Sequence, residues 1–278
     1  MKSRHKHMLA ALVSAAVLTS SGTALAQQQV DDRRTVSANV QVEIEDIIVG
    51  SVRVIGTDSN EMTVTGTIGP DVDEFVIEGG PEYVEIYVEF EDWDDDHNDG
   101  NRRRWRGRER HDVDVDLEIH VPRGATLDIE GVTASFTVEN VDGNIEIESV
   151  TGDIVYSGNA SMIELNNVTG SVTATAGNPM EVDIESVNGH VTYTGSVGPQ
   201  GEISIENVNG SIDLFVPGSI DATFYIETMM GGIENDFGQE PERESRWVPS
   251  QELRFRNGSG SGEVHVETLQ GGVNIRRQ

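Results

Sequence analysis

A short pattern that recurs seven times between residues 136 and 273 constrains the fold of this chain most. It runs apolar, any, apolar, acidic or polar, then Asn, Ser or Thr, apolar, any, Gly, any, and finally Ile or Val. Two clear copies are Val182-Asp-Ile-Glu-Ser-Val-Asn-Gly189-His-Val191 and Ile203-Ser-Ile-Glu-Asn-Val-Asn-Gly210-Ser-Ile212. Alternation of apolar and polar residues is typical of a strand with one buried face. Because so short a repeat cannot bury its own apolar face, the copies must stack, with parallel strands about 4.8 Å apart.

One glycine stands at the same place in every copy, where a turn is expected. These structural turn glycines are Gly143, Gly152, Gly170, Gly189, Gly210, Gly231 and Gly271. A strained turn conformation favours glycine, which has no Cβ. The spacing from Gly152 to Gly231 is nearly even, and the step from Gly231 to Gly271 is about twice as long, which we interpret as two periods with one degenerate copy between them.

The pattern therefore predicts an all-β fold. A parallel β-solenoid, or β-helix, is expected over 126–278, with an insertion at 237–262. Its period is about 20 residues per coil, at the short end of the range for repeat proteins that stack in one direction.

Two further positions of the repeat are polar. The position before the turn carries Asn140, Ser149, Asn167, Ser186, Asn207, Thr228 and Thr268, which we expect to stack as a ladder that satisfies turn backbone groups. The outward position before it carries Glu139, Glu148, Glu185, Glu206, Glu227 and Glu267. Stacked carboxylates repel one another, so either they spread into water or weakly bound divalent cations collect along the row.

Residues 27–125 also alternate but lack the glycine repeat. We expect longer strands in an antiparallel or mixed sheet that caps the first coil, since solenoids need capping ends. A charged insertion at 91–112 interrupts this region, with an acidic half and an arginine half. Its candidate binding residues are Trp93, Arg102, Arg103, Arg104, Trp105 and Arg106. A calcium loop beginning at Asp95 is not favoured, because its twelfth place is Arg106, where a bidentate acid is required.

Residues 1–26 have the features of a secretory signal peptide. Three basic residues precede an apolar stretch from Met8 to Leu18, and Ala24-Leu25-Ala26 fits a cleavage site. No later segment is apolar enough to span a membrane as a helix. The sequence therefore predicts export to the periplasm or the cell surface.

The charge of the chain restricts its partners. Removing the three basic residues of 1–26 changes the formal net charge from −30 to −33, and no Lys or Arg occurs from Gly124 to Glu242. Most non-specific affinity for nucleic acid comes from cationic side chains on phosphates. The sequence thus disfavours nucleic acid and bare anionic lipid as partners, and favours an envelope protein or a surface glycan.

Catalytic motifs are missing from the sequence. There is no cysteine, no lysine after position 26, and neither a Gly-x-Ser-x-Gly elbow nor a phosphate-binding loop. Carboxylates are so abundant that pairs of them have no diagnostic value for a glycosidase. We therefore predict a protein that is not an enzyme and holds no cofactor.

The copies of Val-Asn-Gly-x-Val and Val-Thr-Gly-x-Ile, the segment Gly50–Gly66 and the closing segment Glu267–Ile275 resemble a bacterial family known as putative adhesin. The resemblance implies an envelope-associated β-helical protein of unknown function, with no catalytic residue to carry over. Two hypotheses follow. The first is an adhesin-like or scaffold protein of the cell envelope. The second is a periplasmic accessory of envelope-stress signalling that binds a regulator through its arginine-bearing insertions.

Overall fold

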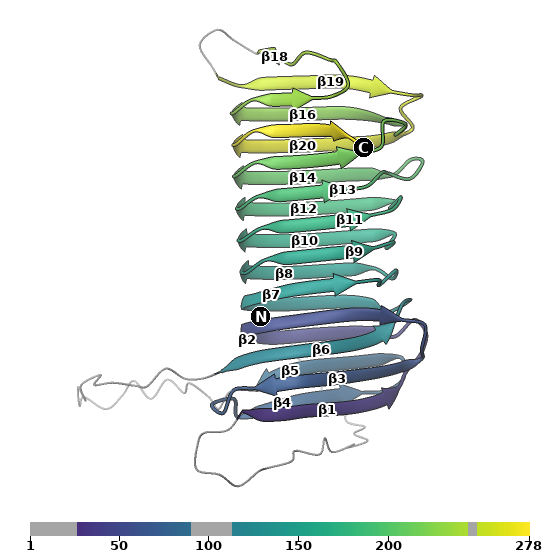
Figure 1. Cartoon of the computed structure of the whole chain (residues 1–278), viewed down its shortest axis with the longest axis vertical. Coiled ribbons are helices and arrows are strands. Elements are labelled where there is room, and N and C mark those ends of the chain that lie inside the picture. Colours follow the sequence, from purple (N-terminus) through teal and green to yellow (C-terminus); the bar gives the residue numbers. More distant parts are fainter. Residues whose placement is uncertain (1–26, 90–112, 244–248) are drawn as a thin grey trace, which may run out of the picture.

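A computed structural model describes residues 27–89, 113–243 and 249–278 of the chain. These residues form twenty-one strands and no helix, so the predicted all-β class is confirmed. Nearly all of the strands lie across the long axis of the molecule and stack along it (Figure 1).

The strands fall into three groups along the sequence. The first comprises β1 (Gln28–Thr35), β2 (Gln41–Thr57), β3 (Glu61–Ile68), β4 (Glu74–Gly79), β5 (Tyr83–Glu89), β6 (Asp114–Pro122) and β7 (Thr126–Glu139). The second comprises β8 (Ile145–Thr151), β9 (Ile154–Gly158), β10 (Met162–Thr169), β11 (Val172–Ala176), β12 (Glu181–Asn188), β13 (Val191–Thr194), β14 (Glu202–Asn209), β15 (Ile212–Val216), β16 (Ala222–Met230) and β17 (Ile233–Asn235). The last comprises β18 (Glu242–Arg243), β19 (Gln251–Asn257), β20 (Gly262–Gln270) and β21 (Val273–Arg277).

Each coil of the repeat contributes one strand to each of two parallel columns. The first column contains β7, β8, β10, β12, β14, β20 and β16, and the second contains β7, β9, β11, β13, β15, β21 and β17. In the first column Ile145, Ile163, Val182 and Ile203 are aligned, so each step between these residues in the sequence is one coil. The long strands β2 and β7 run through both columns.

The register corrects the first copy of the repeat. Strand β7 places Leu127 opposite Ile145 in the first column and Phe136 opposite Ile154 in the second. The segment that begins at Phe136 is therefore half a coil out of phase, which explains the short interval between Gly143 and Gly152. The residues that align with the later copies of the repeat are 127–134. Glu130 occupies the acidic position and Ala134 occupies the glycine position. Asn140 and Gly143 lie instead in the return between β7 and β8.

The order of the last coils also differs from the prediction. Strand β20 pairs in parallel with both β14 and β16, and β21 pairs with both β15 and β17. The last coil is thus inserted between two earlier ones, and in Figure 1 the yellow β20 lies between the green β14 and β16. The residues described between Gly231 and Gly271 form no degenerate parallel coil that would explain the long interval. The segment before the last coil includes β19, which pairs antiparallel with β16 and covers that end of the stack.

At the other end, the first group of strands forms a mixed sheet. Strand β3 pairs antiparallel with β1 and β6, and β4 pairs antiparallel with β5. Strand β2 pairs in parallel with β5, β6 and β7, which joins this sheet to the solenoid.

The core between the columns is packed with aligned side chains. In the second column the large residues Tyr156 and Tyr193 flank the small residue Ala174, and all three are fully buried. The Tyr156 hydroxyl donates to the carbonyl oxygen of Val141 at 3.1 Å and accepts from the backbone N–H of Ala160 at 2.9 Å. Burial raises the pKa of Tyr156 to about 12. The phenol therefore stays neutral and ties the return of one coil to the core.

Candidate binding groove

A groove of about 640 Å³ runs across the strands of the first column, beside the glycine turns. Its lining comes from the same three positions of the repeat in β7, β8, β10, β12 and β14 and from two of them in β20, and Asp46 of β2 lies at one end. Asp46 sits at a bulge with φ of 59°, a backbone conformation that aspartate tolerates better than most residues. We call this feature the groove, and its three lining positions the acidic row, the polar ladder and the aliphatic row.

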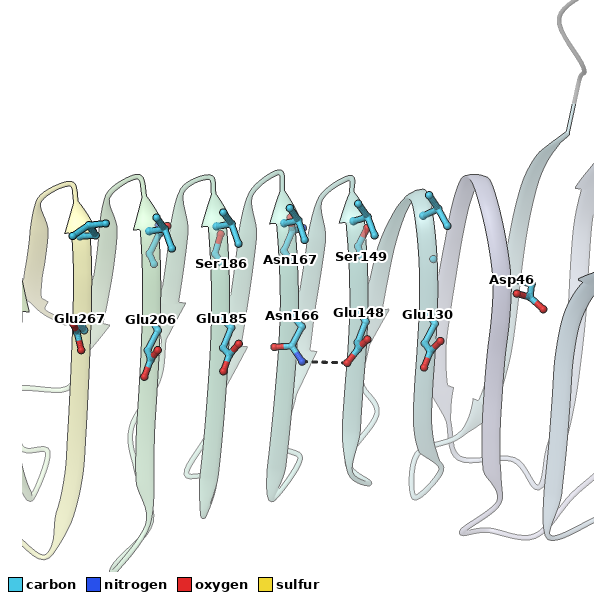
Figure 2. A pocket seen from close by; sticks show the side chains of 18 residues that line it. Asp46, Glu130, Glu148, Ser149, Asn166, Asn167, Glu185, Ser186, Glu206 and Glu267 are labelled. Carbon is cyan, nitrogen blue, oxygen red and sulfur yellow. Dashed lines mark hydrogen bonds between the residues drawn. The ribbon is translucent and has the colours of Figure 1, made fainter. Parts of the chain in front are cut away.

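The acidic row consists of Glu130, Glu148, Glu185, Glu206 and Glu267, with Asn166 between Glu148 and Glu185. Figure 2 shows these side chains in one line across neighbouring strands. Asn166 Nδ2 donates to Glu148 Oε1 at 3.4 Å, which relieves repulsion at one place in the row. Partial burial, followed by the charge of Glu148, raises the pKa of Glu130. Glu139, expected in this row, lies in the second column and pairs with Arg53 at 3.0 Å.

The aliphatic row lies two residues further along each strand and borders the turns. It consists of Val132, Val150, Val168, Val187, Val208 and Leu269, whose exposed fractions are 38–48 %. This row was not predicted from the sequence, because all apolar positions of the repeat were expected in the core. Strict alternation could have revealed it: Ile203 and Ile205 point inward, so Asn207 must point inward and Val208 outward.

The polar ladder lies between the two rows, and its side chains are buried. Five hydrogen bonds join a ladder side chain to a carbonyl oxygen of a turn in the adjacent coil: Ser149 to Ala134 at 2.9 Å, Asn167 to Gly152 at 2.7 Å, Asn207 to Gly189 at 2.9 Å, Thr268 to Gly210 at 3.3 Å and Thr228 to Gly271 at 2.8 Å. The expected ladder is confirmed at these positions. The Oδ1 atoms of Asn167 and Asn207 and the Ser186 hydroxyl have no hydrogen-bond partner within the described ranges.

The turn glycines beside the groove are required mainly because the turns stack closely. A Cβ on Gly189 would lie 1.7 Å from the carbonyl oxygen of Gly170, and a Cβ on Gly210 would lie 1.7 Å from that of Gly189. Gly152, Gly170 and Gly210 also have φ of 142–147°, which side chains rarely adopt. From the sequence, glycine was expected at the turns because of the backbone conformation. The reason that all of these turns share is instead the close approach of the neighbouring turn.

The proposed contact residues of the insertion, Trp93, Arg102, Arg103, Arg104, Trp105 and Arg106, lie outside the described residues. The flanking strands are described: β5 ends at Glu89 in the first column, and β6 begins at Asp114 in the second. Both flanking strands pair in parallel with β2.

A second hollow, of about 480 Å³, lies near the C-terminal end of the stack. The rings of Tyr225 and His265 stack at 4.7 Å, and the Arg254 guanidinium lies 5.8 Å from the Tyr225 centroid. His265 Nε2 is 3.3 Å from Glu263 Oε2. Within the described ranges, no three or more His, Cys, Asp or Glu residues are grouped to hold a metal ion. The same residues form no helix long and apolar enough to cross a membrane.

A family model described as Toastrack DUF4097 matches residues 112–276, which span β6 to β20 and all but the last residue of β21. The chain belongs to the Toastrack family. The resemblance to a bacterial adhesin-type family is thereby confirmed, and the Toastrack match covers every strand that lines the groove except β2.

Several solved structures are similar to this Toastrack chain at low sequence identity. A putative cell adhesion protein from Clostridium sporogenes is 12% identical, with a TM-score of 0.38, over 90% of this chain and 100% of the other. A putative adhesin from Bacteroides fragilis is 10% identical, with a TM-score of 0.31, over 89% and 96%. A putative lipid binding protein from Parabacteroides distasonis is 12% identical, with a TM-score of 0.34, over 89% and 96%. No curated protein matches the sequence. None of these comparisons favours the role in envelope-stress signalling.

Proposed function

We propose that this chain is a non-enzymatic, exported, adhesin-like or scaffold protein of the bacterial cell envelope, which binds an envelope protein or a surface glycan through the groove. The observation that carries the proposal is the exposed aliphatic row. Six coils each place an aliphatic side chain in solvent at the same position, beside a second row of carboxylates. Contiguous exposed apolar surface with a polar rim is typical of an interaction site.

The construction of the groove favours binding of an extended partner. Its lining is repeated on parallel strands that are hydrogen bonded to one another, and the turns are tied together by the polar ladder. A rigid surface loses little conformational entropy when a partner binds, so shallow contacts can still give useful affinity. The features of residues 1–26 support export.

The experiment is capture from native envelope fractions under mild crosslinking. The wild-type chain is compared with V150S/V168S/V187S, which makes the aliphatic row polar without changing charge. We expect discrete envelope material to be recovered with the wild type and lost with the triple variant. A chain lacking residues 91–112 tests the contribution of the insertion separately.

Circular dichroism and thermal unfolding of each variant establish that the fold is intact. If the wild type recovers nothing from any envelope fraction, the binding role is wrong. If turnover is found for any polysaccharide in a glycan panel, the non-enzymatic assignment is wrong.

A further inference from the structure

We infer that the groove binds an extended cationic polypeptide segment in which basic and aliphatic side chains alternate. The inference rests on the proposed binding function and names the chemistry of its partner. It is carried by the juxtaposition of the acidic row and the aliphatic row on opposite sides of one straight groove.

Charge complementarity selects a cationic occupant. The lining includes Asp46 and the five carboxylates of the acidic row, and none of the described residues that line it is Lys, Arg or His. Carboxylates stacked one strand spacing apart repel one another. Partial burial first, and then the charge of Glu148, raises the pKa of Glu130. A cation placed between them relieves that repulsion and gains attraction from more than one carboxylate.

The polar ladder points into the body of the stack and leaves the two rows as the accessible lining. Asn167 and Asn207 are only 4% and 5% exposed, and their Nδ2 atoms donate to the turn carbonyl oxygens of Gly152 and Gly189 at 2.7 and 2.9 Å. The groups that an occupant can reach are therefore the carboxylates and the aliphatic side chains. Guanidinium groups, with five N–H donors, are the side chains best suited to such a row of acceptors.

The aliphatic row requires a partner that also has an apolar side. An extended chain sends successive side chains in opposite directions. If it lies along the groove, its basic residues reach the acidic row and the alternate residues reach the aliphatic row. A neutral glycan matches the carboxylates through its hydroxyls but leaves the aliphatic row uncovered, and a second copy of this strongly acidic chain is repelled.

The length of the groove sets the length of the segment. Six coils, from β7 to β20, are separated by five strand spacings, which amount to about 24 Å at about 4.8 Å each. An extended polypeptide rises about 3.4 Å per residue, so about seven residues fill the groove. Three or four of these would be basic.

The test uses fluorescence anisotropy with the full chain and two labelled ten-residue peptides of identical composition. In the first, arginine and valine alternate. In the second, five arginines precede five valines. We expect the alternating peptide to bind more tightly, and its affinity to fall as salt is added.

The groove variant E148Q/E185Q/E206Q removes three carboxylates of the acidic row and keeps their shape. We expect it to weaken binding of the alternating peptide on the order of tenfold, since each exposed ion pair contributes a factor of a few. The matched control E74Q/E78Q/E82Q removes three exposed carboxylates near β4, outside the groove, and should change affinity less than twofold. V150T/V168T/V187T should weaken binding several-fold at unchanged charge.

Three results overturn the inference. One is equal loss of affinity in the groove variant and the control, which indicates attraction to net charge alone. Another is equal binding of the two peptides. The third is binding that appears only when residues 91–112 are deleted, which assigns the groove to the arginine-rich segment of this chain. Failure here is distinct from failure of the proposed function: envelope capture that persists in E148Q/E185Q/E206Q overturns the cationic partner and leaves the binding role intact.

Discussion

At the scale of single residues, the turns beside the groove tolerate almost no added atom. Each turn glycine lies against a carbonyl oxygen of the turn in the neighbouring coil, at distances that a Cβ cannot share. The same carbonyl oxygens at Gly152, Gly189, Gly210 and Gly271 accept hydrogen bonds from the polar ladder. One position of the repeat therefore sets both the spacing of the turns and their hydrogen bonding.

The first prediction concerns Gly189. We expect Gly189→Ala to lower the free energy of unfolding by roughly 1–3 kcal/mol or more, because the new methyl group overpacks a site that backbone atoms surround. Urea unfolding of the wild type, of Gly189→Ala and of a control variant measures the change. Gly232→Ala is the matched control, since nothing lies within 4 Å of the Cβ that it adds. Equal stability of the two variants would show that turn stacking does not require glycine.

At the scale of the strands, the C-terminal end of the stack depends on an aromatic cluster. Phe255 of β19 stacks on Phe224 of β16 with centroids 4.4 Å apart, and Phe237 lies 5.3 Å from Phe255. These contacts hold β19 against β16, where it covers an edge that would otherwise be free to pair with another molecule.

The second prediction follows from this cap. Phe255→Ala should cost about 2 kcal/mol, less than the loss for a fully buried phenylalanine, and should promote self-association through β16. Size-exclusion chromatography with light scattering over rising protein concentration measures the association. Phe215→Ala, on a partly exposed position of β15, makes the same change away from the cap and should stay monomeric. A monomeric Phe255→Ala chain at every concentration would contradict the role of the cap.

The strands also show what the sequence could and could not predict. Alternation and the glycine period were enough for parallel stacking of β8, β10, β12 and β14, because each local pattern has one buried face. They could not place β20, since Val264 and Val266 fit equally well beside β14 or after β16. The half-coil error at Phe136 has a related cause: second-column strands also alternate, so a local match does not identify the column. The aliphatic row of the groove could have been predicted from the sequence. If alternation places the Asn207 side chain inward, the next side chain, Val208, must point outward.

At the scale of the whole molecule, uncompensated carboxylates make stability depend on pH. Burial, together with neighbouring acids, raises the pKa of Glu130, Glu146 and Asp183 in the folded chain. At a pH between the pKa values of the unfolded chain and the raised values of the folded chain, the folded state binds more protons than the unfolded state. The free energy of unfolding therefore falls as the pH rises through this window.

The third prediction is that the melting temperature increases when the pH is lowered from 7 toward 5. Thermal unfolding followed by circular dichroism at constant ionic strength measures it. The gain should be smaller in E130Q/E146Q, which removes two of the raised groups. Asp221 acts in the opposite direction at much lower pH: hydrogen bonds from Ser259 and Gly260 lower its pKa to about 2, so its contribution is lost only as the pH falls through that value. A melting temperature that decreases steadily from pH 7 to pH 5 would contradict the prediction.

The fourth prediction concerns ions. Because no Lys or Arg lies between Gly124 and Glu242, repulsion along the acidic row is relieved mainly by ions from solution, and added salt should raise the melting temperature. If divalent cations collect along the row, CaCl₂ should stabilise the chain more than NaCl at equal ionic strength, since one divalent ion attracts two stacked carboxylates at once. E148Q/E185Q/E206Q should then lose most of the difference between the two salts, while E74Q/E78Q/E82Q keeps it. If the two salts raise the melting temperature equally, general screening explains the effect. If neither salt changes the melting temperature, repulsion along the acidic row destabilises the fold very little.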